Sequence, residues 1–432
     1  MNTQLHHQLQ LQFSHNGQLQ RRDFLKAIAG TTAAASGLAW SDQLTASAAD
    51  LRKQGKACIL LWMQGGPSQF ETFSPKPGHD NGGETKAIST AVPGIEIAAG
   101  LPKTAAMMKD LCVIRSMNSR EGAHPRATYL MHTGYLPTAS VKYPTLGSIV
   151  SHEIGDHGAE LPSFVRIGAG RFGDSAGLLG VDYDPFVMQS ASRSPENTSL
   201  PTSSARYGRR LNLLGKLEQD FAAKGGQQEV ADHQKVYDRA AKMILSPQMK
   251  AFDLDQESAG TRKLYGDSEF GKGCLLARRL VQAGVTFIEV SLGNWDTHFD
   301  NFTNTTRLCG QLDQPFAALI EDLKQQGMLD NTLVLWMGEF GRTPKINPRS
   351  GRDHFPKAFN MALAGGGVKG GQVIGKTNAS GDSVTDSPVN VNDMLRTVVS
   401  GLGINADKEN MSNIGRPIKI VDGGKLVPGI FG

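Results

Sequence analysis

A series of short apolar runs along most of the chain constrains the fold more than any other feature. The runs are nearly continuous in hydrophobicity rather than alternating, which is typical of strands covered on both faces of a parallel sheet. Helical patterns precede several of them, and this succession predicts an α/β fold with right-handed crossovers. The runs lie at 57–63, 111–117, 285–292, 332–338 and 360–366.

The middle of the chain departs from this pattern. Residues from about 205 to 265 are polar with a helical period, and we expect a helical insertion there rather than a second domain. Residues 170–204 are rich in Gly, Ser and Pro and are expected to form a long surface loop. The sequence therefore predicts a single α/β domain over residues 49–432.

The N-terminus predicts an export signal. The stretch "QRRDFLKAIAGTTAAASGLAW" has paired Arg21 and Arg22 before a weakly apolar segment, and "ASAAD" supplies a cleavage site after Ala48. We therefore expect residues 1–48 to be a twin-arginine signal peptide, recognised by the twin-arginine export machinery. The apolar segment is too short to remain as a membrane span, so the mature protein is expected in the periplasm or at the cell surface.

Charge and cysteine content exclude several classes of partner and site. The formal net charge is +4, so nothing indicates a nucleic acid or an anionic membrane as partner. The four cysteines show no spacing typical of a metal site. Two of them lie inside apolar runs, where a small buried hydrophobe is the simpler interpretation.

Two glycine-rich stretches match nucleotide-binding patterns without the required context. "GGQVIGKT" (370–377) fits the phosphate-loop pattern, but "NASGDSVTDSP" follows and does not favour the helix that would hold phosphates. "GAGRFG" (168–173) fits a dinucleotide pattern, and again no helix is expected after it. We interpret neither as a nucleotide site: Val373 and Ile374 are typical of a strand inside the first stretch, and the second is a glycine-rich loop.

Polar side chains gather where the predicted strands end. Ligands of open parallel sheets bind beyond the carboxyl ends of the strands, so these side chains are candidates for one common site. They are Ser68 after the first run, Arg120, His124 and Arg126 after the second, Asp296 and His298 after the third, Glu339 and Arg342 after the fourth, and Arg352, Asp353 and His354 further along.

The mixture of carboxylates and imidazoles favours a divalent metal, zinc or manganese in preference to calcium. Asp296, His298 and Asp300 alternate, so an extended loop would point all three the same way. The arginines suit a tetrahedral anion such as phosphate or sulfate. The predicted metal ligands are Asp296, His298, Glu339, Asp353 and His354.

Six segments in order resemble the DUF1501 family. They are "QRRDFLKAIAG", "WMQGGPSQFETFSPKPG", "HPRATYLMHTGY", "GCLLARRLVQAGVTFIEVSLGNWDTHFDN", "NTLVLWMGEFGRTPKIN" and "GRDHFPKAFNMALAGGGVKGGQVIGKT". That family consists of exported bacterial proteins and is grouped with alkaline phosphatase-like and sulfatase-like folds. The resemblance implies an alkaline phosphatase-like three-layer sandwich with a mostly parallel central sheet.

A more distant likeness to sulfatases fails at the catalytic positions. Glu339 falls on a sulfatase metal ligand, but Phe340 falls on its Asn partner and cannot bind a metal. The sulfatase nucleophile would fall near Gly122, which has no nucleophilic side chain. If the chain hydrolyses esters, we therefore expect a metal-activated water rather than a covalent intermediate. His124 or Ser119 held by Arg126 remains an alternative nucleophile.

Two functions follow from this interpretation. The first is an exported metal-dependent hydrolase of phosphate or sulfate esters, acting on a small molecule or a glycan. The alternative is a non-catalytic periplasmic or surface protein that keeps the fold and binds anionic or sulfated glycans. For the hydrolase, the predicted catalytic residues are His124, Arg126 and Arg342, and the predicted substrate-binding residues are Arg120, Arg352 and Ser68.

Overall fold

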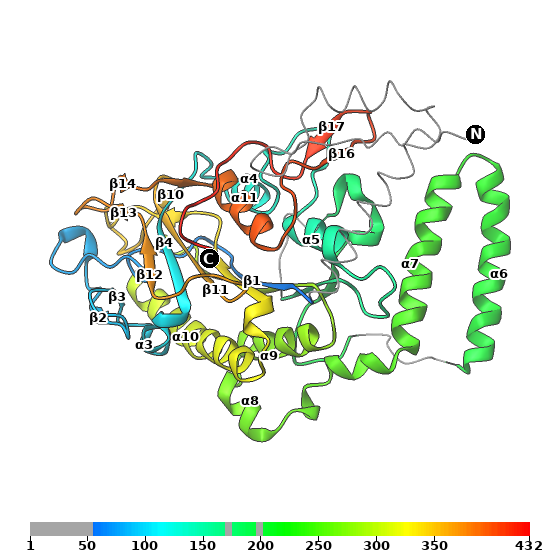
Figure 1. Cartoon of the computed structure of the whole chain (residues 1–432), viewed down its shortest axis with the longest axis horizontal. Helices are drawn as coiled ribbons and strands as arrows, with labels where there is room; N and C mark the ends of the chain where they lie inside the picture. Colours follow the sequence, from blue (N-terminus) through cyan, green and yellow to red (C-terminus); the bar gives the residue numbers. More distant parts are fainter. Residues whose placement is uncertain (1–54, 169–174, 196–201) are drawn as a thin grey trace, which may run out of the picture. The chain divides into compact units, whose positions relative to one another are not determined.

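A nine-stranded sheet lies at the centre of the part that this computed structural model describes, residues 55–168, 175–195 and 202–432 (Figure 1). All of these residues belong to one compact unit, Gln54–Gly432. The predicted signal peptide, 1–48, lies outside the described residues. The strands of the sheet are β1 (Ala57–Met63), β4 (Leu111–Asn118), β5 (Phe164–Ile167), β6 (Phe186–Met188), β7 (Phe287–Leu292), β8 (Thr332–Met337), β11 (Phe359–Ala364), β12 (Gln372–Ile374) and β15 (Val389–Asn390).

The sheet is mostly parallel, as predicted. Its strand order is β12-β4-β11-β8-β1-β7-β5-β6, and β15 pairs with β4 beside this path. Strand β11 is antiparallel to both of its neighbours, and the other pairs are parallel. The central strand β1 pairs with β8 on one side and β7 on the other, so three predicted strands end at the same edge.

The five apolar runs form strands because both faces of the sheet are covered. Every residue of β1, β8 and β11 is buried. The sequence did not reveal β6, which lies within the stretch expected to be a loop. With three residues, β6 carries too little pattern to separate it from its surroundings.

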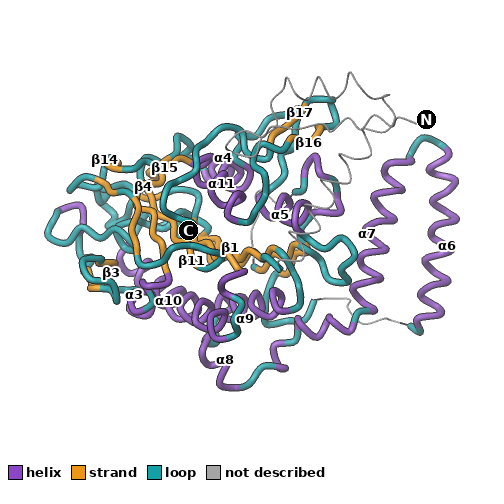
Figure 2. Tube along the Cα trace, viewed as in Figure 1, coloured by secondary structure: helices purple, strands orange, loops and turns teal. Residues whose placement is uncertain are grey.

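Helices cover both faces of the sheet and complete three layers (Figures 1 and 2). On one face, α9 packs against β7 and α10 against α9, while α5 packs on the other face against β5 and β7. Figure 1 shows α4 and α11 on the same side as α5. The helices are α3 (Pro102–Ala106), α4 (His124–Thr133), α5 (Leu146–Ile154), α6 (Ser204–Ala223), α7 (Gln227–Leu245), α8 (Ala259–Tyr265), α9 (Glu269–Gln282), α10 (Asn301–Gln325) and α11 (Val391–Gly401).

Short two-stranded sheets lie outside the central sheet. One of them, the β9/β10 hairpin, carries residues of the candidate site. The stretch "GGQVIGKT" forms β12 and β13 rather than a phosphate loop before a helix, which agrees with the strand expected at Val373 and Ile374. The short pairs are β2 (Ala87–Ser89) with β3 (Glu96–Ala98), β9 (Gly341–Arg342) with β10 (His354–Phe355), β13 (Lys376–Thr377) with β14 (Val384–Asp386), and β16 (Glu409–Met411) with β17 (Pro417–Lys419).

The expected insertion at about 205–265 is helical and consists of α6, α7 and α8 with short 3-10 turns. Among the described residues, no helix has both the length and the apolar character needed to cross a bilayer. All four cysteines are buried free thiols, which confirms the interpretation of the two that lie inside apolar runs.

Candidate metal centre

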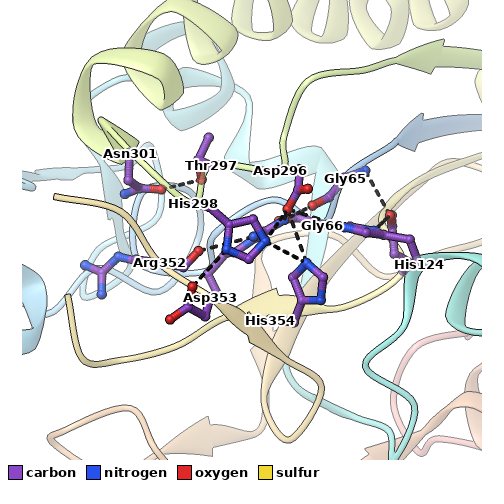
Figure 3. Close-up of polar contacts among 12 residues, drawn as sticks. Gly65, Gly66, His124, Asp296, Thr297, His298, Asn301, Arg352, Asp353 and His354 are labelled. Atoms are coloured by element: carbon purple, nitrogen blue, oxygen red, sulfur yellow. Dashed lines mark hydrogen bonds and ion pairs between the residues drawn. The ribbon is translucent and has the colours of Figure 1, made fainter. Parts of the chain in front are cut away.

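A cluster of histidines and acids lies where β1, β7 and β8 end, as the sheet edge rule predicts (Figure 3). His124 is the first residue of α4. Asp296 and His298 lie in the loop after β7, and His354 begins β10. Side chains from segments that are far apart in the sequence therefore lie close together at this edge of the sheet.

The Nε2 atoms of three histidines converge on one oxygen, Asp296 Oδ1. The distances to that oxygen are 3.3 Å from His124, 3.0 Å from His298 and 3.2 Å from His354. The Nε2 atoms of His298 and His354 are themselves only 3.0 Å apart. The ligand atoms of His124, Asp296 and His354 all lie within 4.8 Å of one another.

The other ring nitrogen of each histidine faces an oxygen acceptor. An ionised carboxylate or a backbone carbonyl can only accept a hydrogen bond, so each Nδ1 carries the hydrogen and each Nε2 of a neutral ring keeps its lone pair. The contacts are His124 Nδ1 to Glu339 Oε1 at 2.6 Å, His298 Nδ1 to Asp353 Oδ1 at 2.8 Å, and His354 Nδ1 to the Gly122 carbonyl at 2.8 Å.

This arrangement fits a cation. Three imidazole lone pairs and a carboxylate oxygen are all acceptors, and acceptors at such distances repel one another unless a proton or a metal lies between them. One of these imidazole nitrogens, His124 Nε2, and one further acceptor, Glu339 Oε2, are buried and make no hydrogen bond within the described residues. An imidazole fixed by an oxygen at its second nitrogen is also the usual second-sphere arrangement of histidine metal ligands.

The local charges shift two pKa values in opposite directions. Burial acts to lower the pKa of His124, but the carboxylates of Asp296 and Glu339 outweigh it and raise that pKa to about 9. Burial acts to raise the pKa of Asp296, but hydrogen bonds from two histidines and from Arg342 hold it well below its usual range. The site therefore favours the charged forms of both the Asp296 carboxylate and the His124 imidazole.

Gly65 lets the end of β1 approach the loop that carries Asp296. Its φ is +112°, and a Cβ atom there would lie 2.5 Å from the backbone nitrogen of Asp296. Its N–H donates to Glu339 Oε1 at 2.9 Å, which fixes the carboxylate that faces His124. The glycine pair after the first strand is therefore a structural part of the site.

The β9/β10 hairpin places His354 opposite Arg342 in register. Gly351 in this hairpin packs so closely on the His298 carbonyl that a side chain would collide with it. The Asn347 amide donates to the same carbonyl at 3.0 Å. The hairpin and the loop after β7 are thereby fixed to each other.

Arg342 is buried and donates hydrogen bonds to several of these segments. Its side chain is 0% exposed, and it donates to Asp296 Oδ1 at 2.6 Å and to the Gly66 carbonyl at 2.9 Å. It also donates to the Gly65 carbonyl and, at 3.2 Å, to the Arg352 carbonyl. We expected Arg342 to be catalytic. With these donors occupied by the protein, its observed contacts are those of a positioning residue.

Two residues expected to bind substrate are buried. Arg352 is 0% exposed, and it donates to Glu71 Oε1 at 2.9 Å and to the Asn81 carbonyl at 2.7 Å. Ser68 is 1% exposed, and its hydroxyl finds no partner within the described residues. A substrate from solvent reaches neither of them in this conformation, so we assign neither a substrate-binding role.

Arg120 and Arg126 differ, because both lie at the surface near the start of α4. Arg126 Nε donates to Glu121 Oε2 at 2.7 Å, yet half of its side chain remains exposed. Arg120 makes no ion pair within the described ranges. Both guanidinium groups are therefore accessible to an anion from solvent.

Phe340 forms an apolar wall for the imidazoles. Its ring centroid lies 4.8 Å from that of His124 and 4.6 Å from that of His354. Phe340 stood out in the sequence only as a missing metal ligand. The Gly122 carbonyl, which fixes His354, carried no signal at all because any residue supplies a carbonyl.

Asp300 departs from the expected alternation. Its backbone adopts a left-handed conformation, with φ of 46°, just before α10. The loop is therefore not extended at that point, and Asp300 lies outside the histidine cluster. In the second glycine-rich stretch, "GAGRFG", residues 169–173 lie outside the described part of the chain.

A family model described as "Protein of unknown function (DUF1501)" matches residues 55–431. No curated protein matches the chain. Among solved structures, the lipoteichoic acid synthase LtaP from Listeria monocytogenes is similar at 11% identity and a TM-score of 0.40, covering 87% of this chain and 76% of that one. The PsFucS1 sulfatase from Pseudoalteromonas sp. is similar at 13% identity and 0.39, covering 84% and 72%.

A protein in the alkaline phosphatase superfamily from Vibrio parahaemolyticus is similar at 12% identity and a TM-score of 0.38, covering 83% of this chain and 75% of that one. The expected likeness to alkaline phosphatase-like and sulfatase-like proteins is therefore found again among solved structures. Scores of this size carry no argument about the chemistry of the site, which is interpreted from its own residues.

Proposed function

Because the chain belongs to the DUF1501 family, whose function is unknown, we propose from its own geometry that it is a divalent-metal-dependent hydrolase of phosphate or sulfate esters. The single observation that carries this proposal is the convergence of three imidazole nitrogens on Asp296 Oδ1. Each ring is fixed through its other nitrogen, so the convergence is built into the fold.

The ligands of the metal would be His124, His298, His354 and Asp296. Three imidazoles with one carboxylate favour zinc or manganese over calcium, which prefers an all-oxygen shell. Glu339 and Asp353, predicted as ligands, would instead orient His124 and His298 through their Nδ1 atoms. A bound divalent cation supplies a Lewis acid that polarises an ester oxygen and lowers the pKa of water.

An anionic ester fits the surroundings of this centre. Arg126 and Arg120 are exposed near the start of α4 and would bind the phosphoryl or sulfuryl oxygens. The N-terminus of α4 has no side-chain cap, so its partial positive charge also favours an anion there. Arg342 would act indirectly, by holding Asp296 in place.

Export by the twin-arginine route to the periplasm or cell surface is part of the proposal. It rests on Arg21, Arg22 and the cleavage pattern before Asp50. This route carries folded proteins, which suits a protein that acquires its metal before export. Substrates would then be small esters or glycan esters that reach the outside of the cell.

The experiment is a hydrolysis assay on an aryl phosphate and an aryl sulfate with the metal-stripped protein, after addition of zinc, manganese or calcium. We expect turnover of one ester class with zinc or manganese, and its loss in a His298→Ala/His354→Ala variant. An Arg307→Ala variant on the surface of α10 serves as the control and should match the wild type. Metal binding without turnover of either ester would favour the glycan-binding alternative and end the hydrolase proposal.

A further inference from the structure

Helix α6 carries a stripe of apolar side chains that remains exposed within the described part of the chain. Leu213, Leu217 and Phe221 are 59%, 64% and 58% exposed. They follow one another at intervals of four residues and therefore share one face of the helix. A helix of 20 residues is about 30 Å long, so this face can make an extended contact.

Another face of α6 already has a partner. Helix α6 packs against α7, and Figure 1 shows α7 between α6 and the sheet. Glu218, which is 9% exposed, bonds to His233 of α7 and marks the inner face. The leucine stripe lies on a different, exposed face of the helix, where isolated apolar residues are common but an aligned row is not.

The charged residues that flank the stripe would meet opposite charges if two copies of α6 packed against each other in antiparallel orientation. Arg210 lies five residues before Gly215, and Asp220 lies five residues after it. Leu213 and Leu217 lie two residues before and after the same point. Two copies of α6 that run antiparallel, with the two-fold axis at the level of Gly215 along the helix, would thus pair Leu213 with Leu217 and Arg210 with Asp220, each pair twice.

The next positions extend this match. Arg209 and Phe221 lie six residues on either side of Gly215, so a guanidinium would face an aromatic ring. Within the described residues, neither Arg210 nor Asp220 makes an ion pair, so both are available to a partner. Only the outermost pair, Arg206 with Lys224, brings like charges together, and it does so at the exposed ends, where solvent screens them.

We propose that α6 is an isologous dimerisation surface. A second copy of this chain binds there in antiparallel orientation, with the two-fold axis at the level of Gly215 along the helix. The two α6–α7 hairpins would then form a four-helix arrangement outside the α/β domains. The contact is independent of the histidine centre, because α6 contributes no residue to that centre.

The test is the molar mass of the full chain measured by sedimentation equilibrium over a range of micromolar concentrations. We expect a dimer, and we expect Leu213→Asp/Leu217→Asp to raise its dissociation constant by roughly 100-fold or more, since each substitution acts twice in the interface. Leu264→Asp on α8, an exposed leucine outside the stripe, serves as the matched control and should not change it. Circular dichroism shows whether the variants keep the helix content of the wild type.

A charge exchange tests the register. Arg210→Asp and Asp220→Arg should each weaken the dimer by roughly tenfold, and the double variant should return to within about threefold of the wild type. A wild-type chain that stays monomeric, or a dimer that tolerates both aspartates in the stripe, would overturn the proposal. Weakening by both single exchanges without recovery in the double variant would also overturn it, because the antiparallel pairing requires the recovery.

Discussion

The Nε2 atoms of His298 and His354 lie 3.0 Å apart, although the Nδ1 atom of each ring already faces an oxygen acceptor. Two neutral rings fixed in this way would present lone pairs to each other. Asp296 Oδ1 adds a third acceptor within 3.2 Å of both. A cation relieves this repulsion, and the geometry of the pair therefore indicates a metal centre more directly than the mere presence of histidines does.

The carboxylates behind the histidines should tune the metal affinity without providing it. We expect Glu339→Gln to raise the metal dissociation constant by roughly 10- to 100-fold, because the amide no longer holds the His124 ring as strongly. Asp353→Asn should have a smaller effect, since Asp353 is more exposed than Glu339. Competition with a chromophoric chelator measures both, with Asp330→Asn as a surface control. Wild-type affinity in the Glu339 variant would exclude this role.

Loss of the Arg342 side chain should destabilise the domain. The guanidinium is completely buried, and its removal leaves buried carbonyls and the Asp296 carboxylate without a donor. We expect Arg342→Ala to reduce the free energy of unfolding by roughly 3–5 kcal/mol. Urea unfolding followed by fluorescence gives this value. A loss below about 1 kcal/mol, together with strongly reduced turnover, would instead assign Arg342 a direct catalytic role.

Arg126 should act on substrate binding and not on stability. Its side chain is half exposed and bonds only to Glu121 within the described residues, so we expect Arg126→Ala to leave the unfolding free energy within about 0.5 kcal/mol of the wild type. Binding of inorganic phosphate or sulfate to the metal-loaded protein should weaken by roughly tenfold. Calorimetry measures this affinity. Arg126→Lys should recover part of it, and unchanged affinity in the alanine variant would refute the assignment.

Glu153 links α5 to the C-terminal segment and should make stability depend on pH. Burial acts to raise the pKa of Glu153, but hydrogen bonds from His152 and Lys408 outweigh it and lower that pKa. The stabilisation is therefore fully present above the ordinary carboxyl pKa of about 4.3 and is lost as the pH falls through the lowered folded-state value.

Glu153→Gln should accordingly cost about 1 kcal/mol of unfolding free energy at pH 7, and the difference from the wild type should shrink as the pH falls below about 4. Urea unfolding of both proteins across this range measures the difference. Because both proteins lose any metal alike in acid, that effect cancels in the comparison. A difference that persists unchanged at the lowest pH would show that the ion pair is not its cause.

The layered fold followed from the sequence because buried parallel strands have a strong and simple signature. Strands β1, β8 and β11 are apolar along their whole length, and their burial on both faces requires this pattern. Strand β6 has three residues and β15 only two, so their pairing depends on neighbours that the local sequence does not contain. The short edge elements were therefore not predictable.

The site residues were predictable as a group but not in their individual positions. The strand ends predicted that His124, Asp296, His298 and His354 would meet, because they follow strands of one sheet. Burial could not be predicted in the same way: Arg342 and Arg352 resemble surface anion ligands in sequence, yet both lie inside the domain. Long-range partners such as Glu71 and the Gly65 carbonyl decide this burial, and their contacts span more than 270 positions of the chain.

The most direct test of the proposed metal centre is the metal content of the protein purified from a host with intact twin-arginine export, measured by inductively coupled plasma mass spectrometry. We expect about one equivalent of zinc or manganese per chain and less than about a tenth of that in His298→Ala/His354→Ala, with Arg307→Ala unchanged. A folded wild-type protein that contains no transition metal, and takes up none on dialysis against zinc or manganese, would contradict it.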